Sequence, residues 1–436
     1  MMSSHSILVF ANVCLLLILG VPNHLSAAPI RNVILCIGDG MGPEQVKAAR
    51  LYAGTNLFFE SFPYRTIMET ASASSTVTDS AAGATAMATG IRVNNGVISL
   101  KLPGDGSELE TLLEYFKGKG KSTGLVATAY ITHATPAAFG AHETSRYNTN
   151  EIADDYLNQT KPNVLFGGGG NGMVASNAIA AGYTVVTDTN ELFALDTDVE
   201  TFVSGQFGSG VLPYEVRGVH GNLPHLHQMV QVALDILDND PDGFFLMIEG
   251  SAIDLAGHGN YLAGNIHETI EFANSVKTVA DWMGDRQDTL LLVTADHETG
   301  GLVVTNDNGA GNYPDVTWST TGHTDTPVPV YGIGLNANLV TNVVANTNIY
   351  AVAISSALVQ EVGVSILVDS NGYHMTWTSA SNDIYELEYV SDLISATNWQ
   401  SWGTVTSVSS RLTITDTNLL DSSKFYRLIS KEAYNP

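Results

Sequence analysis

The chain has 436 residues and a net charge of −26, because 44 acidic side chains outnumber 18 basic ones. So few lysines and arginines argue against a nucleic-acid-binding protein, which needs a basic patch to neutralise phosphates. With 44% hydrophobic and 14% charged residues, the chain can bury a large core and does not have the composition of a disordered protein. Its two cysteines cannot form a disulfide framework.

The N-terminus has the pattern of an export signal. Residues Ile7 to Val21 are almost continuously apolar, and small residues follow at Leu25-Ser26-Ala27. We therefore predict a signal peptide over residues 1–27 and an exported protein, periplasmic or extracellular. The alternative is an uncleaved anchor. No later stretch is long and apolar enough to cross a bilayer, so we expect no membrane span in the mature chain.

Short apolar segments alternate with helical segments along the body of the chain. Most predicted strands are rich in Val, Ile and Leu without alternation, as in strands buried on both faces. They are Asn32–Ile37, Gly124–Ala127, Val164–Phe166, Tyr183–Val186, Gly243–Ile248, Thr289–Val293 and Val328–Ile333. The predicted helices are Pro43–Leu51, Asp79–Thr89, Glu108–Gly118, Leu223–Leu237, Asn265–Met283 and Asn348–Val362. This order predicts a three-layer αβα sandwich with a mostly parallel central sheet, whose functional site lies at the carboxyl ends of the strands.

The composition changes near Val364. The remaining chain is rich in Ser, Thr and Asn, and its apolar residues alternate with polar ones, as in half-exposed strands. The strands predicted there are Tyr373–Thr378, Tyr385–Tyr389, Leu412–Thr415 and Phe425–Ile429. We therefore predict a main domain over residues 28–363 and a small β-sandwich over residues 364–436.

Asp, Glu and His residues gather where predicted strands end or begin. They are Asp39 after the first strand, Glu249 after Gly243–Ile248, Asp254 and His258 shortly beyond it, Asp296 and His297 after Thr289–Val293, and His323 before Val328–Ile333. Taken alone, each is also compatible with an ordinary turn or a surface contact. Together they favour a metal site, because carboxylates and imidazoles can share a divalent ion.

One serine is a candidate nucleophile. Ser80 begins a predicted helix of small residues, where the helix dipole and free backbone N–H groups favour an alkoxide and an approaching phosphate. The other interpretation is a serine that only caps the helix, which is the commoner role at such a position. Spacing alone leaves both open.

These motifs, taken in order, resemble the alkaline phosphatase family. The matching segments are Asp79-Ser80-Ala81 with Gly83 and Thr85, Glu249 with Asp254 and His258, Asp296-His297-Glu298-Thr299-Gly300, and Gly322-His323-Thr324. The resemblance covers roughly Ile30 to Val362, and the short separation of His297 and His323 is typical of compact bacterial members. It implies an α/β fold, two zinc ions and one magnesium ion per chain, and hydrolysis of phosphate monoesters through a phosphoserine.

The resemblance also implies a role for each matching residue. Ser80 matches the nucleophile, and Arg146 matches the arginine that clamps two phosphate oxygens. The implied metal ligands are Asp254, His258 and His323 for the first zinc, Asp39, Asp296 and His297 for the second, and Asp39, Thr135 and Glu249 for magnesium. His133 matches a position beside the magnesium site where some members have Asp, so we expect weaker magnesium binding.

Other functions remain open at this point. The nearest alternatives are a phosphodiesterase or sulfatase of the same superfamily, although the chain lacks the sulfatase modification motif and Arg146 favours monoesters. An inactive scaffold that presents the β-module is a further alternative, against which the complete ligand set argues. The expected partners are small phosphate monoesters. The sequence leaves open whether the protein is a homodimer or a monomer. The role of the module is also open and could be surface attachment, glycan binding or a secretion signal.

Overall fold

A computed structural model describes residues 31–358 and six later strands, at 365–369, 372–378, 384–390, 400–406, 411–416 and 425–431. The predicted signal peptide lies outside the described residues. Residues 31–358 belong to one compact unit, and the later strands belong to a second.

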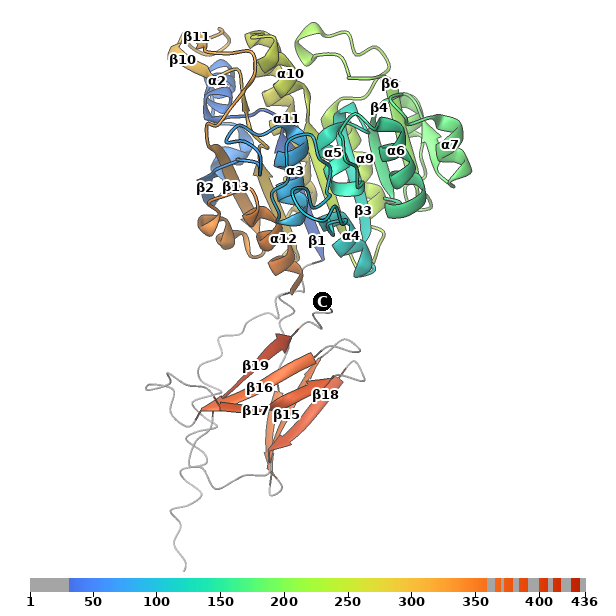
Figure 1. The fold of residues 1–436 in the computed structure, drawn as a ribbon, viewed down its shortest axis with the longest axis vertical. Helices are drawn as coiled ribbons and strands as arrows, with labels where there is room; N and C mark the ends of the chain where they lie inside the picture. The colour runs from blue at the N-terminus through green and yellow to red at the C-terminus, as the bar shows by residue number, and fades with distance from the viewer. Residues whose placement is uncertain are drawn as a thin grey trace, which may run out of the picture. The chain divides into compact units, whose positions relative to one another are not determined.

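The middle layer of the first unit is a nine-stranded sheet with the strand order β2-β13-β8-β1-β7-β3-β4-β6-β5 (Figure 1). Its strands are β1 (Asn32–Gly38), β2 (Tyr64–Met68), β3 (Ser122–Tyr130), β4 (Val164–Gly169), β5 (Thr184–Val186), β6 (Val203–Ser209), β7 (Phe244–Gly250), β8 (Thr289–Thr294) and β13 (Val328–Gly334). Only β13 runs antiparallel to its neighbours β2 and β8. The predicted mostly parallel sheet is therefore confirmed.

All seven strands predicted in this unit are present in the nine-stranded sheet, whose other two strands, β2 and β6, were not predicted. β2 lies at the sheet edge, where the side chains of Arg65 and Ile67 are exposed. β6 contains two glycines, two serines and a glutamine, which have little intrinsic preference for strands. Parallel pairing with β4 and β5 makes this segment a strand.

Two groups of helices cover the sheet (Figure 1). One group is α2 (Pro43–Ala53), α9 (Leu226–Leu237), α10 (Ala252–His258) and α11 (Leu262–Met283), in which α11 contacts the other three as well as β1, β7 and β8. The other is α3 (Ser80–Thr89), α4 (Leu112–Gly118), α5 (Ala134–Gly140), α6 (Thr149–Asp155) and α12 (Asn348–Leu358), in which α4 and α5 contact β3 and β7. The short helices α7 (Ala175–Ala180) and α8 (Thr189–Phe193) lie near β5 and α9, respectively.

The six predicted helices are all present. Five have a start or an end shifted by up to four residues, and the predicted end of the sixth, at Val362, lies outside the described residues. α4 begins at Leu112 because Thr111 caps it, accepting a hydrogen bond from the Glu114 N–H at 3.2 Å. Helices α5 to α8 are short and were not predicted, and α5 contains Pro136. Among the described residues, no helix has the length and hydrophobicity needed to cross a membrane.

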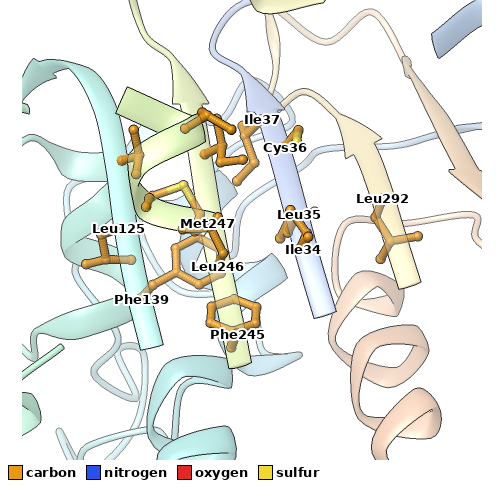
Figure 2. Packing of buried hydrophobic residues seen from close by; sticks show 14 of the residues in the cluster. Ile34, Leu35, Cys36, Ile37, Leu125, Phe139, Phe245, Leu246, Met247 and Leu292 are labelled. Atoms are coloured by element: carbon orange, nitrogen blue, oxygen red, sulfur yellow. The ribbon is translucent and has the colours of Figure 1, made fainter. Parts of the chain in front are cut away.

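The core is densest around the central strands. Figure 2 shows Ile34 and Leu35 of β1 between Met247 of β7 and Leu292 of β8, and all four side chains are fully buried. Burial of each such side chain contributes about 1.5–3 kcal/mol. Cys36 lies in the same cluster, and burial raises the pKa of its thiol well above the usual range, so it acts as a small hydrophobic residue. This packing holds the strand ends in fixed positions.

The second unit contains two three-stranded antiparallel sheets. One consists of β14 (Ser365–Asp369), β15 (Gly372–Thr378) and β18 (Arg411–Asp416), and the other of β16 (Ile384–Val390), β17 (Gln400–Thr406) and β19 (Phe425–Lys431). The four predicted strands are β15, β16, β18 and β19, whereas β14 and β17 were not predicted. Packing of the sheets as a sandwich and a boundary at 363/364 stay predictions.

Candidate metal centre

Three neighbouring strands bring carboxylates to one edge of the sheet. Strands β8, β1 and β7 are adjacent, and Ile37 of β1 aligns with Glu249 of β7 and with Thr294 of β8. Asp39 follows β1, Asp296 follows β8, and both are fully buried, as is Glu249. Within the described part of the chain, both carboxylate oxygens of Asp39 and of Glu249 lack a hydrogen-bond partner, as does Oδ2 of Asp296. Buried carboxylates without partners indicate a cation site.

The pKa values of these groups show the cost of burying them without a cation. Burial, followed by the negative charge of Asp254, raises the pKa of Asp296 to about 8. Burial also raises the pKa of Glu249 to about 7. The pKa of Asp39 lies well above its usual value because of burial and the neighbouring Asp296. A bound divalent cation would favour the ionised form of all three.

Two imidazoles face each other beside a fourth carboxylate. The Nε2 atoms of His258 and His323 lie 3.1 Å apart. Their Nδ1 atoms lie 2.6 Å from the Thr321 carbonyl oxygen and 2.9 Å from the Thr78 carbonyl oxygen. Because a carbonyl only accepts, each Nδ1 carries hydrogen, and in the neutral tautomer both Nε2 lone pairs face the same space. Asp254 oxygens lie 3.3 Å and 3.5 Å from these Nε2 atoms, so the three groups converge on a cation position.

His297 joins the two groups of ligands. Its Nε2 lies 3.5 Å from Oδ1 of Asp39 and 3.2 Å from Oδ2 of Asp296, and its ring stacks on that of His323 at 3.6 Å. Burial, and then the charge of His323, lowers the pKa of His297 well below its usual value, which favours the neutral imidazole that binds metals. Potential ligand atoms of Asp39, Asp296 and His297 lie within 4.8 Å of one another, as do those of Asp254, His297 and His323.

A third group of ligands lies between β7 and α5. Asp39, His133 and Glu249 also bring ligand atoms within 4.8 Å of one another, and Nδ1 of His133 lies 4.0 Å from Oε1 of Glu249. Burial, and then the charge of Arg146, lowers the pKa of His133 to about 4. Thr135 lies in the first turn of α5, and its buried hydroxyl makes no hydrogen bond within residues 31–358. Asp39 is thus common to two of the groups.

Helix α3 places its first residue beside this cluster. Ser80 is buried, and its Oγ lies 3.2 Å from Nε2 of His297. The helix can approach the end of β8 because Gly83 has no side chain. A Cβ at Gly83 would lie 3.0 Å from the carbonyl oxygen of Asp296, closer than ordinary contact. Asp79 caps the helix by accepting a hydrogen bond from the Ala82 N–H at 3.0 Å.

An arginine is held by the aspartate that caps this helix. Arg146 donates from Nη1 to Oδ2 of Asp79 at 3.1 Å, and its Nη2 lies 3.3 Å from Nε2 of His133. Asp79 also accepts from the Gly96 N–H at 3.0 Å, and the Arg146 N–H donates to the Gly96 carbonyl at 2.8 Å. Asp79 is therefore a positioning residue that the sequence did not predict. The sequence had offered Ser80 as the possible cap of this helix, but the cap is Asp79, and its contacts with Gly96 and Arg146 had no local signal.

Glu298 is a second buried residue to which the sequence assigned no role. It accepts hydrogen bonds from Gln45 Nε2 at 2.7 Å, from the Gly301 N–H at 3.1 Å and from the hydroxyl of Thr324. These bonds connect β9 (Glu298–Thr299), β12 (His323–Thr324) and α2. They hold the segments that carry His297 and His323.

The structure brings the sequence-predicted residues into one neighbourhood. The residues linked by the distances above are Asp39, Ser80, His133, Arg146, Glu249, Asp254, His258, Asp296, His297 and His323. Thr135 lies two residues beyond His133 with its hydroxyl unpaired, and no distance above joins it to the others.

The fold and the site are those of an α/β protein with a candidate metal centre and a buried serine at the strand ends. More particularly, the chain belongs to the alkaline phosphatase family, whose model matches residues 30–181 and 173–314. It is 40% identical to alkaline phosphatase 3 of Bacillus subtilis over 63% of this chain and 62% of that protein. It is 30% identical to the alkaline phosphatase of Escherichia coli over 66% of this chain and 74% of that protein. The chain thus spans less than two thirds of the Bacillus relative.

Solved structures give the same result. The cold-active alkaline phosphatase of a Shewanella species has a TM-score of 0.69 and 29% identity, covering 75% of this chain and 99% of that one. The alkaline phosphatase of the Antarctic bacterium TAB5 has a TM-score of 0.68 and 28% identity, covering 76% and 98%. A TAB5 variant in which a histidine is replaced by aspartate has a TM-score of 0.68 and 27% identity over the same shares, and its structure holds Mg in the M3 site.

Proposed function

We propose that this protein is a metal-dependent phosphomonoesterase that releases inorganic phosphate through a phosphoserine on Ser80. One observation carries the proposal: a buried serine hydroxyl lies 3.2 Å from His297 and beside carboxylates that have no partner. Membership of the alkaline phosphatase family supports it. Small phosphate monoesters are the proposed substrates.

The residues present fit three metal ions. Asp254, His258 and His323 would hold one zinc ion, and Asp39, Asp296 and His297 a second, because mixed imidazole and carboxylate ligands suit zinc. Asp39, Thr135 and Glu249 offer only oxygen ligands, which suit magnesium. When bound, such ions supply Lewis-acid stabilisation of the entering and leaving oxygens of a displacement at phosphorus.

The protein's own groups would perform two displacements. Ser80 Oγ forms a bond to phosphorus as the bond to the ester oxygen breaks, and the alcohol leaves. The N-terminus of α3 stabilises negative charge on Oγ and on the phosphoryl oxygens. Arg146, held by Asp79, presents a planar guanidinium that can bind two phosphate oxygens at once. Water then cleaves the phosphoserine, which releases inorganic phosphate and restores the serine.

The test compares three substrate classes in the presence and absence of a chelator. We expect a phosphate monoester to be hydrolysed fastest by the metal-loaded protein, and the chelator to remove that activity. Faster hydrolysis of a diester or a sulfate ester would instead favour another enzyme of the superfamily. No hydrolysis of any of the three by protein loaded with zinc and magnesium would favour an inactive scaffold.

The third group of ligands leads to a prediction about magnesium. His133 is neutral at pH 7, given its pKa of about 4, and imidazole is a poor ligand for a hard cation. His133→Asp should therefore tighten magnesium binding and reduce the need for added magnesium. The measurement is a magnesium titration of activity and of binding, with the partly exposed His267→Asp on α11 as control. Superimposable titrations for the unaltered protein and His133→Asp would contradict this assignment.

The second unit leads to a prediction about truncation. We propose that residues 28–363 are the catalytic domain, because every proposed site residue precedes Val364 and domains usually join where few contacts cross. A chain ending at Val362 should fold, bind zinc and keep its kcat towards a small monoester. Activity, zinc content and thermal unfolding should be compared with those of the whole chain. A large fall in kcat of a folded, zinc-loaded truncated protein would mean that the module contributes to the site.

The remaining proposals concern location and assembly. We propose that residues 1–27 direct export to the periplasm or beyond and are then removed. We further propose that the β-module contacts a glycan or cell surface, and that the catalytic domain acts as a homodimer or a monomer.

A further inference from the structure

A second cluster of potential metal ligands lies in the loop between β6 and α9. Glu215 begins the 3₁₀ helix η3 (Glu215–Arg217), His220 follows it, and His225 immediately precedes α9. Ligand atoms of the three side chains lie within 4.8 Å of one another. Nε2 of His220 is 3.2 Å from Oε1 of Glu215, and Nδ1 of His225 is 2.8 Å from Oε2 of Glu215. None of these residues belongs to the candidate metal centre.

The buried histidine of this cluster lacks the partners that burial normally requires. The His220 side chain is only 7% exposed. Neither of its ring nitrogens makes a hydrogen bond within residues 31–358, because the short approach to Glu215 does not have hydrogen-bond geometry. Buried polar atoms are nearly always paired with protein groups, water or an ion. A buried ring nitrogen that lies 3.2 Å from a carboxylate oxygen without bonding to it therefore indicates a ligand that both atoms can contact.

The two rings of the cluster lie close enough together to share one ion. The rings of His220 and His225 stack with centroids 4.3 Å apart and an interplanar angle of 27°. Glu215 approaches one nitrogen of each ring, so a single divalent ion could be bound by both imidazoles and the carboxylate.

The backbone around the cluster is held by other elements. The Glu215 N–H donates to Oε1 of Glu268 on α11 at 2.7 Å. The His225 N–H donates to Oε1 of Gln228 in the first turn of α9 at 2.9 Å. Tyr214, next to Glu215, packs edge-on against Tyr261 at the start of α11, with ring centroids 5.7 Å apart. The ligands are thus positioned before any ion binds, which lowers the entropic cost of binding.

We propose that Glu215, His220 and His225 form an additional binding site for a divalent transition metal of the zinc class. Two imidazoles and one carboxylate suit zinc and its neighbours, whereas calcium and magnesium prefer oxygen ligands. The side chain of His225 is 36% exposed, so an ion can reach the site from solvent and water can complete its coordination. The ion holds the 215–225 loop against the start of α9. The proposal does not depend on the function of Ser80.

The test counts zinc in the full chain and in variants of each site. The protein is loaded with excess zinc, freed of unbound metal by gel filtration and analysed by mass spectrometry. His220→Gln and His225→Gln should each hold one zinc fewer per chain than the unaltered protein. His267→Gln on α11, which lies outside both sites, should hold the same number as the unaltered protein. Far-UV circular dichroism checks that each variant is folded.

A second background separates this site from the catalytic one. Asp254→Ala combined with Asp296→Ala removes ligands from both proposed zinc positions of the catalytic centre, yet that protein should still hold one zinc. Adding His225→Gln should remove it, and the partly exposed position of His225 makes this the variant least disruptive to folding. Equal zinc contents before and after His225→Gln in this background would overturn the proposal, whatever the activity of the unaltered protein.

Discussion

Ser80→Ala should lower kcat for a phosphate monoester by about 10³-fold or more, because it removes the hydroxyl that we propose forms the covalent intermediate. The binding of inorganic phosphate should persist, since Arg146 and the metal ligands are unchanged. The buried Ser80 side chain is small, so the folded structure should tolerate alanine at the start of a helix already capped by Asp79. The measurements are kcat, KM and the inhibition constant for phosphate.

Trapping the intermediate makes this test specific to the residue. Rapid acid quench of the unaltered protein during turnover should leave phosphate on Ser80, identified by peptide mass spectrometry. Ser176→Ala, at an exposed position near the start of α7, serves as the matched control and should behave like the unaltered protein. Phosphate on another residue, or unchanged turnover in Ser80→Ala, would show that Ser80 is not the nucleophile.

The sequence predicted the site because parallel strands place their carboxyl ends together. Asp39, Glu249 and Asp296 each follow or end an apolar run, and neighbouring parallel strands bring such residues to one edge. The order of the strands was not predictable from these runs. Adjacency of β8, β1 and β7 depends on packing between segments more than two hundred residues apart, which hydrophobic patterns do not encode.

Other features of the site depend on contacts that have no local signal. Asp79 and Arg146 are far apart in the sequence, and their ion pair exists only because the loop at Gly96 reaches both of them. The residues of the second cluster are close together in the sequence, since Glu215 is followed by His220 and His225 within eleven residues. The cluster was not predicted because the path of the 215–225 loop depends on contacts distant in sequence, such as the hydrogen bond from the Glu215 N–H to Glu268 on α11.

Dialysis of the protein against a chelator should reduce monoesterase activity to the uncatalysed background, and zinc together with magnesium should restore it. The reason is the set of buried carboxylates without partners, which repel one another unless cations lie between them. Metal-free protein should also unfold at a lower temperature, because ions that bind only the folded state stabilise it. Full activity in rigorously metal-free protein would exclude the proposed mechanism.

Single substitutions should distinguish the parts of the centre. Asp39 belongs to two groups of ligands, so Asp39→Asn should lower the content of both zinc and magnesium. Glu249 belongs only to the group that contains His133, so Glu249→Gln should lower magnesium and leave zinc unchanged. Asp105→Asn, an exposed residue remote from these groups, is the control. If Glu249→Gln lost zinc and magnesium to the same extent as Asp39→Asn, Glu249 would not be a ligand of the magnesium site alone, and the division into separate sites with Asp39 as the shared ligand would be contradicted.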